Sequence, residues 1–242
     1  MKKLLLILGL LLITLSSCQI TERVYINEDG SGTFDLEINM NEMMKSMAEM
    51  GGEKPDSTAV AKDSIINFSD LLIDKKDSIA KLPKEEREQI EMLKDMTVKI
   101  HEDKSKSEMS ISYLIKFKDV NDLAKAQNML SNANKMNKGD DGLASKSDLH
   151  FSFKGNMFSR KSIDKDLNEE EKTEYDSSMS KFNMFMEGSA YNIEYHFPKP
   201  IKSTTAKNAT FSDDRKILYI KSTMDTFIED AKVLDFDVIL IK

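Results

Sequence analysis

Residues 98–117 read VKIHEDKSKSEMSISYLIKF. Apolar and polar residues alternate on both sides of a polar turn at Asp103–Ser105, and the apolar residues after that turn would share one face of a strand: Met109, Ile111, Tyr113, Ile115 and Phe117. A period of two on each side of a turn is typical of a β-hairpin. We therefore predict two antiparallel strands here.

The same alternation recurs elsewhere in the chain, interrupted by segments with helical spacing. Hairpins are expected around the turn Asp29–Gly32, with alternation from Val24 to Met40, and around Gly155-Asn156. Single strands are expected at residues 191–197, 204–211, 217–223 and 234–241. Helical spacing predicts helices near residues 40–50, 69–82, 84–96, 121–132 and 168–187. Hairpins alternating with single helices, without the spacing of βαβ units, predict an α+β fold. We expect an antiparallel β-sheet built from hairpins, with interspersed helices packed on one face.

The composition excludes several classes of function. The 242 residues include 35 basic and 42 acidic residues, so the formal net charge is −7. A net acidic chain without a basic block is a poor binder of nucleic acid and gains nothing from anionic headgroups. We expect no nucleic-acid partner and one α+β domain over residues 18–242. The stretch 131–148, rich in Asn, Lys, Gly and Asp, is the candidate internal boundary.

The N-terminus has the order of residues found in a secretory signal. Lys2 and Lys3 precede a twelve-residue apolar run, Leu4–Leu15, which Ser16, Ser17 and Cys18 follow. Basic, apolar and small residues in that order indicate export, and the apolar run is too short to span a bilayer. We predict a cleaved signal peptide over residues 1–17.

The end of this signal, Leu15-Ser16-Ser17-Cys18, resembles the lipobox of bacterial lipoproteins. The resemblance implies that Cys18 becomes the mature N-terminus and that its sulfur carries a diacylglyceryl group. Two or more acyl chains, palmitate for example, are needed for stable attachment to a bilayer. Because Cys18 is the single cysteine, lipidation would leave no thiol for a disulfide, a zinc site or a nucleophile. The alternative is an ordinary secretory signal with a cysteine beside it.

The residues after Cys18 determine what this resemblance implies about the location of the protein in the cell envelope. In Gram-negative lipoproteins an aspartate after the cysteine retains the protein at the inner membrane, and here that residue is Gln19. Some Bacteroidota lipoproteins reach the cell surface through an acidic run at this point, which residues 20–23 lack. The resemblance therefore implies attachment to the outer membrane, with the periplasmic side favoured over the cell surface.

A stripe of methionines is the strongest candidate for a metal-binding site. Met40, Met43, Met44, Met47 and Met50 recur at helical spacing. Thioethers select Cu(I), so a periplasmic copper-binding lipoprotein using the Met40–Met50 helix is one hypothesis. Methionine is also a flexible core filler, and the same spacing buries one face of any amphipathic helix. We expect core packing, with metal binding or a deformable partner-binding surface as alternatives.

Two further patterns favour ordinary structural roles. Asn27–Phe34 partly matches a calcium loop, but the position of the bidentate glutamate falls on Ile38, so a hairpin turn is expected. The three histidines, His101, His150 and His196, each lie in or beside a predicted strand and are interpreted as polar-face residues. They could also converge on one sheet face as metal ligands.

The sequence contains two matches to the Ser-x-x-Lys core of penicillin-binding enzymes. Ser78-x-x-Lys81 and Ser178-x-x-Lys181 both lie in predicted helices rich in Lys and Ser. The companion Ser-Asp-Asn and Lys-Thr-Gly elements are missing, so we assign no catalytic residue. A hydrolase acting on envelope polymers is a third, unsupported class.

Beyond the lipobox, the chain resembles envelope lipoproteins of Bacteroidota in its Asn27–Gly32 hairpin, its Asp63–Phe68 segment and a strand that ends in Phe197-Pro198. The early Asp-Gly hairpin and this late strand are also similar to the LppM-type envelope domain. Neither resemblance implies a catalytic residue. We therefore expect a lipid-anchored, non-catalytic binding or assembly module without a cofactor, which uses an unknown protein or small-molecule partner.

Overall fold

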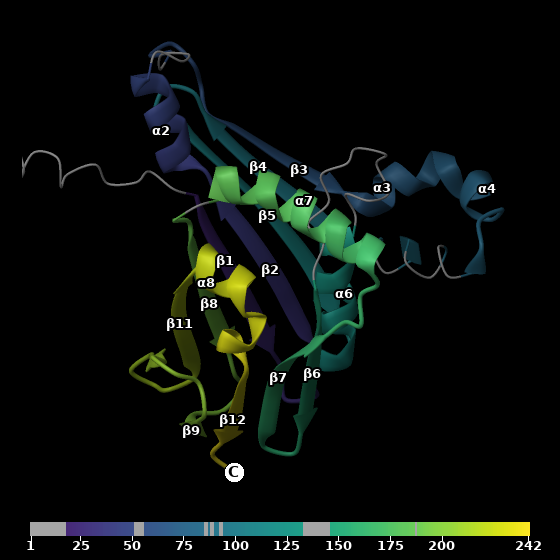
Figure 1. Cartoon of the computed structure of the whole chain (residues 1–242), viewed down its shortest axis with the longest axis vertical. Helices are drawn as coiled ribbons and strands as arrows, with labels where there is room; N and C mark the ends of the chain where they lie inside the picture. The colour runs from purple at the N-terminus through teal and green to yellow at the C-terminus, as the bar shows by residue number, and fades with distance from the viewer. Residues whose placement is uncertain are drawn as a thin grey trace, which may run out of the picture.

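The computed structural model describes residues 18–50, 56–84, 87, 90–91, 94–132, 146–186 and 188–242. The predicted signal peptide and most of the candidate boundary at 131–148 lie outside these residues. In the described part, strands form two sheets, with helices between them in the chain (Figure 1).

The larger sheet, sheet A, contains β10 (Thr210–Phe211), β11 (Ile217–Thr223), β8 (Ala190–His196), β1 (Gln19–Ile26), β2 (Gly32–Asn39), β5 (Glu108–Phe117), β4 (Met96–Asp103) and β3 (Lys62–Asn67), in that spatial order. Sheet B contains β6 (Ser147–Lys154), β7 (Met157–Asp164), β12 (Phe236–Leu240) and β9 (Ile201–Thr204). All neighbouring strands run antiparallel except β1 and β8, which are parallel.

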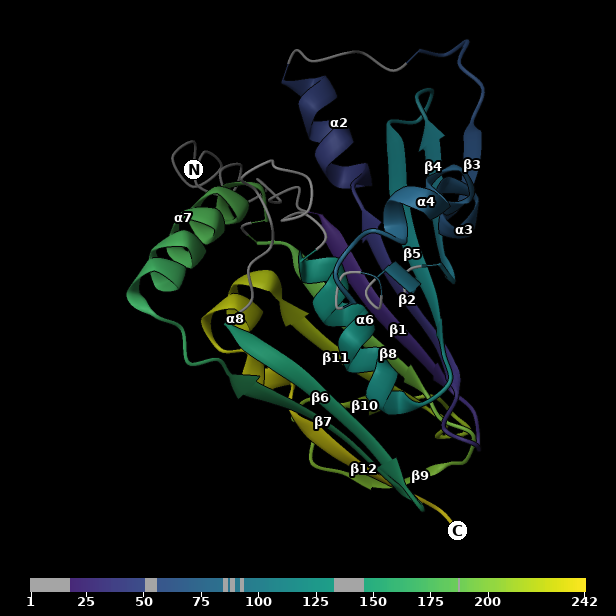
Figure 2. The same ribbon diagram turned by 90° about the vertical axis from the view of Figure 1, so that its right-hand side faces the viewer.

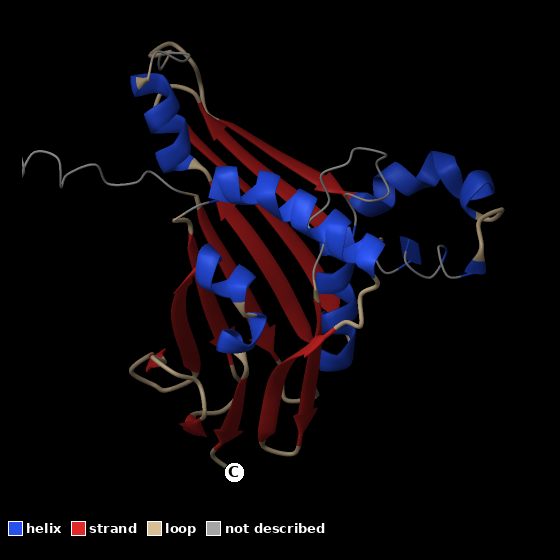
Figure 3. Cartoon of the chain, viewed as in Figure 1, coloured by secondary structure: helices blue, strands red, loops and turns tan. Residues whose placement is uncertain are grey.

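The helical elements are α2 (Asn41–Glu49), α3 (Phe68–Leu72), η1 (Ile73–Lys75), α4 (Lys76–Ile79), α6 (Val120–Asn132), α7 (Glu169–Met186), α8 (Met224–Glu229) and η3 (Ala231–Leu234). Helices α6, α7 and α8 lie on the same side of sheet A as sheet B (Figure 2). Figure 3 separates the two kinds of element by colour. The predicted α+β class is confirmed.

Several parts of the prediction were incomplete, and the single strand expected at residues 204–211 was wrong, because β9 and β10 there belong to different sheets. β1 begins at Gln19, five residues before the expected start at Val24, and its parallel pairing with β8 joins segments far apart in the chain. β3 forms at residues 62–67, where no strand was expected, and all six of its residues are exposed. Sheet B was not expected as a separate layer. Strands at a sheet edge or paired over long range carry little local signal.

Aromatic and aliphatic side chains fill the space between sheet B and the adjacent half of sheet A. Phe158 of β7 is fully buried, and its ring centroid lies 5.6 Å from that of Tyr195, 5.4 Å from that of Phe197 and 6.0 Å from that of Phe236. Aromatic pairs at these separations stabilise a core beyond the area they bury. This aromatic cluster therefore holds the two sheets together.

Gly32 allows β1 and β2 to pair tightly beside that core. A Cβ atom at Gly32 would lie 2.0 Å from the Tyr25 carbonyl oxygen and 2.4 Å from the Phe117 ring. Only glycine permits so close an approach of backbone and ring. The first turn of the chain uses Gly30, whose φ of 84° is in the left-handed region.

Candidate functional site

Cys18 immediately precedes the first residue of β1. Its carbonyl oxygen accepts a hydrogen bond from the Ala190 N–H at 3.2 Å, so the residue is tied to the start of β8. The side chain is 4% exposed, and Sγ lies 3.9 Å from Sδ of Met43 in α2. Burial raises the pKa of the Cys18 thiol. The predicted lipidation site is thus joined to a paired strand without a linker.

Helix α2 is fixed beside Cys18 by two asparagines. The Asn41 N–H donates to Asn39 Oδ1 at 3.0 Å, and Asn41 Oδ1 accepts a hydrogen bond from the Met109 N–H at 2.8 Å. Asn39 itself faces Gln19 in the β1–β2 register. We call this part of the molecule, formed by Cys18, the end of β2, α2 and the start of β8, the Cys18 end (Figure 1).

The methionine stripe of α2 is divided between the core and the surface. Met40 and Met43 pack against the core, as predicted. Met47 and Met50 are 55% and 89% exposed, so the expectation of core packing was wrong for them. A Cu(I) site needs several soft ligands around one point. Because the sulfurs are distributed over a partly buried and an exposed part of the helix, the copper hypothesis stays the alternative.

The three histidines lie in different parts of the fold. His101 of β4 pairs with Asp63 of β3, with Nδ1 2.8 Å from Oδ1. His196 of β8 lies 2.5 Å from a Glu194 oxygen and stacks on the Tyr25 ring. His150 is exposed and belongs to sheet B. The idea that they converge on one sheet face was therefore wrong.

The calcium-like turn uses its own side chains. Asp29 Oδ1 accepts hydrogen bonds from the Ser31 hydroxyl at 2.6 Å and from the Ser31 N–H at 3.0 Å. These hydrogen bonds, the hydroxyl one first, lower the pKa of Asp29. The Asn27 amide also donates to the Ser31 hydroxyl. The predicted hairpin turn is confirmed.

Among the described residues, neither Ser-x-x-Lys match belongs to a catalytic arrangement of side chains. Ser78 lies in the short helix α4, and both Ser78 and Lys81 are exposed. The other match, Ser178-x-x-Lys181, lies within α7, and its side chains are outside the described part of the chain.

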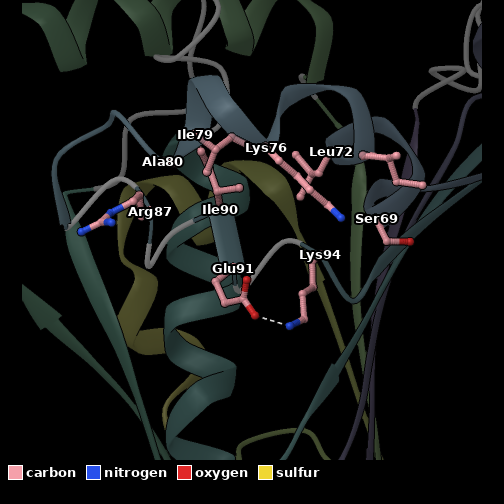
Figure 4. A pocket seen from close by; sticks show the side chains of 10 residues that line it. Ser69, Leu72, Lys76, Ile79, Ala80, Arg87, Ile90, Glu91 and Lys94 are labelled. Atoms are coloured by element: carbon pink, nitrogen blue, oxygen red, sulfur yellow. Dashed lines mark hydrogen bonds and ion pairs between the residues drawn. The ribbon is translucent and has the colours of Figure 1, made fainter.

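A hollow of about 390 Å³ lies between α3–α4 and residues 87, 90, 91 and 94 (Figure 4). Its apolar lining comes from Leu72, Ile73, Ile79, Ala80 and Ile90, and its polar lining from Ser69, Lys76, Arg87, Glu91 and Lys94. Glu91 and Lys94 pair with each other. Lys76, Arg87, Glu91 and Lys94 are all exposed, so the charged groups around this hollow are solvated.

Sequence reasoning missed a buried polar cluster between the two sheets. Glu22 of β1 is 1% exposed and accepts hydrogen bonds from the hydroxyls of Tyr191, at 2.7 Å, and Tyr195. Arg160 of β7 is fully buried, with Nε 3.9 Å from a Glu22 oxygen. Its Nη1 donates to the Leu234 carbonyl oxygen at 2.8 Å. The four side chains form what we call the Glu22 cluster.

The electrostatics of the Glu22 cluster favour a fixed structural role. Burial lowers the pKa of the Arg160 guanidinium, but the Glu22 carboxylate, Tyr195 and Tyr191 together more than offset this, so the net shift is upward. Burial and then the nearby Glu22 raise the pKa values of Tyr191 and Tyr195 well above the ordinary value. The arginine therefore stays charged and the phenols stay protonated at neutral pH. Since Glu22 and the tyrosines belong to sheet A and Arg160 belongs to sheet B, the cluster links the two sheets.

One sequence signal could have revealed this cluster. Glu22 occupies the same strand face as Ile20, Val24 and Ile26, so a carboxylate interrupts an otherwise apolar face. A buried carboxylate needs a cation or several donors. Its donors come from positions up to 173 residues away, and no local pattern identifies them.

A salt-bridge network on the opposite face of sheet A reinforces β1. Arg23 Nη1 lies 2.6 Å from a Glu37 oxygen and 3.5 Å from an Asp35 oxygen, both on β2, and its Nε lies 3.6 Å from a Glu194 oxygen on β8. Burial raises the pKa of Asp35 despite the nearby arginine. Arg23 therefore links β1 to both neighbouring strands.

The Glu22 cluster predicts strong coupling between its two charged members. Arg160→Met or Glu22→Gln alone should lower the free energy of unfolding by about 3–5 kcal/mol, because each leaves a buried partner uncompensated. The double variant should lose clearly less than the sum of the single losses. Urea unfolding of residues 18–242 carrying Cys18→Ser measures these values. Additive losses would contradict the coupling. Removing the exposed Lys232–Asp164 pair should leave the free energy of unfolding almost unchanged, because water screens this pair.

The raised pKa of Tyr195 predicts a dependence of stability on alkaline pH. The folded chain holds this phenolic proton more tightly than the unfolded chain, where tyrosine ionises near pH 10. The stabilising contribution of Tyr195 should therefore be complete below about pH 9 and be lost as the pH rises above about 10. The free energy of unfolding of Tyr195→Phe should fall less steeply over this range. Tyr219→Phe is the control, because Tyr219 lies on the outer face of sheet A. If the stability of Tyr195→Phe falls with pH as steeply as that of the parent chain and of this control, Tyr195 is not the titrating group.

Among the described residues, no helix combines the length and apolar character needed to cross a membrane. No family model matches the chain, and no curated protein matches it. The chain is structurally similar to the folded domain of the Mycobacterium tuberculosis LppM protein, solved by NMR, with 9% sequence identity and a TM-score of 0.42. The similarity covers 93% of this chain and 89% of that one.

Proposed function

We propose that this chain is a lipid-anchored cell-envelope lipoprotein that acts as a non-catalytic binding or assembly module. The observation that carries the proposal is the position of Cys18. It ends a lipobox-like Leu15-Ser16-Ser17-Cys18 segment, and the folded sheet begins at the next residue. Processing before Cys18 would thus remove residues 1–17 and leave β1 complete.

The buried sulfur is compatible with acylation if the modification precedes folding or if the side chain turns outward. In the folded arrangement Sγ lies against Met43, so an attached diacylglyceryl group would begin beside α2. Each buried methylene contributes about 0.8 kcal/mol, and two chains hold a protein stably at a bilayer. Since the chain is acidic, acyl chains rather than charge would provide the attachment.

Two features support binding over catalysis. The buried charged groups of the Glu22 cluster contact one another and bridge the sheets. Near the Cys18 end, the inner face of sheet A carries partly buried apolar side chains: Leu36, Ile38, Val98, Ile111 and Tyr113. Four of these side chains, Leu36, Ile38, Val98 and Tyr113, also pack against the core, so only their exposed remainder would be available to a partner.

The residues after Cys18 support a location. Gln19 in place of aspartate and the absence of an acidic run at residues 20–23 favour the outer membrane and its periplasmic side. This placement belongs to the proposal and comes from the lipobox resemblance.

Replacement of Cys18 tests the anchor. The full chain with its leader, expressed in a Gram-negative host, should incorporate labelled palmitate and sediment with membranes. Cys18→Ser should abolish the label, because serine lacks the sulfur that forms the thioether. Gln19→Asp is the matched control and should keep the label while moving the protein to the inner-membrane fraction. An unlabelled parent chain, or mass spectrometry showing an unmodified residue 18 after export, would overturn the proposal.

A further inference from the structure

The proposed anchor would have no flexible tether, and this inference rests on that proposed function. Gln19 already pairs with Asn39 of β2 and with Ala190 of β8, and the Cys18 carbonyl is itself hydrogen bonded. A lipid on Cys18 would therefore be attached directly to a strand with neighbours on both sides. Such a domain cannot move away from the bilayer, so the surface around Cys18 must contact it.

Helix α2 provides the part of that surface nearest to Cys18. Sγ of Cys18 lies 3.9 Å from Sδ of Met43, which faces inward on α2. Farther along the same helix and at its end, Met47 and Met50 are 55% and 89% exposed. These exposed apolar side chains, about one and two helical turns from Met43, would otherwise stand in water.

The charges on α2 favour an apolar contact over an electrostatic one. Glu42 and Lys45 pair with each other, with Oε1 and Nζ 2.9 Å apart, and Glu49 is the remaining charged residue of the helix. A helix without excess positive charge gains nothing from anionic headgroups. Its affinity for a bilayer must come from buried apolar area.

We propose that α2 docks on the phospholipid bilayer, with Met47 and Met50 inserted at the boundary between headgroups and acyl chains. The lipid on Cys18 supplies the attachment, and α2 fixes the orientation of the domain. The end of β1 that is distant from Cys18 then points away from the membrane, together with the turn between β6 and β7.

Tryptophan fluorescence on the lipidated protein tests this docking, because the chain contains no tryptophan. The Met47→Trp variant would be purified with its lipid and reconstituted into phosphatidylcholine vesicles, with or without brominated acyl chains. Bromine quenches only a nearby indole. We expect the brominated lipid to lower the emission of this variant roughly twofold or more, because interfacial helices sit about 5–10 Å into this boundary. Met50→Trp serves as the second variant should Met47→Trp fail to fold.

Met157→Trp is the matched control, since Met157 is also an exposed methionine, at 46%. It lies beside the β6–β7 turn, close to Gly30 at the far end of β1, and the eight residues of β1 span about 26 Å. The indole of this control variant should not be quenched. Equal emission with and without bromine in both the Met47→Trp and the Met50→Trp variants would overturn the docking proposal.

Two further outcomes have defined meanings. Quenching of the Met47→Trp variant that disappears in high salt would also overturn the proposal, because an apolar contact is not screened. A blue shift that depends on protein concentration, without quenching by bromine, would indicate a second copy on α2 and overturn it too. Failure of the purified protein to co-float with vesicles would instead contradict the anchor itself, so the two proposals fail in different ways.

Discussion

Strand β1 is paired on both of its sides, and the other elements of the fold are arranged around it. β2 binds it antiparallel and β8 binds it parallel, and Arg23 links it to both through carboxylates on the outer face. On the inner face, Glu22 reaches across to Arg160 of sheet B. One strand of eight residues therefore joins the hairpins of sheet A, the second sheet and the residue proposed to carry the lipid.

The Glu22 cluster shows how a buried charge can specify an arrangement. A buried ion pair is weak evidence for stability, because desolvation offsets much of the attraction. Its geometry is nevertheless demanding: Glu22 meets two phenols of β8 and the guanidinium of β7 at the same time. A shift of β1 by one residue would turn Glu22 to the solvent face and place Thr21 or Arg23 in the core. No tight turn sets the alignment of the parallel β1–β8 pair. We therefore infer that the cluster fixes the register of these two strands.

The sequence predicted those elements whose signal is local. Strands β4 and β5 match the alternation of residues 98–117, and the turn at Asp29–Gly32 lies between β1 and β2, because hairpins place their pattern and their turn in one segment. The first residues of β1 were missed since Glu22 and Arg23 interrupt the apolar pattern. β3 was missed because neither of its faces is buried.

For the candidate site, the sequence identified Cys18 and the methionine helix but not their relation. Helical spacing correctly placed α2, yet it assigned all five methionines to one buried face, whereas Met47 and Met50 lie on the surface. The contact between Cys18 and Met43, and the donors around Glu22, depend on long-range pairing that no single segment encodes. The period of a sequence pattern shows which residues share one face of a helix or strand, but not which other element packs against that face.

Hydrogen exchange at the start of the mature chain measures how firmly the first residues of β1 are paired. If β1 is paired from its first residue, the amides of Ile20–Val24 in the lipidated protein should exchange as slowly as those in the middle of β2. Opening them would require separation of β1 from both neighbours. Fast exchange over these residues, with protection beginning only at Val24 or later, would reveal a flexible tether and contradict the account.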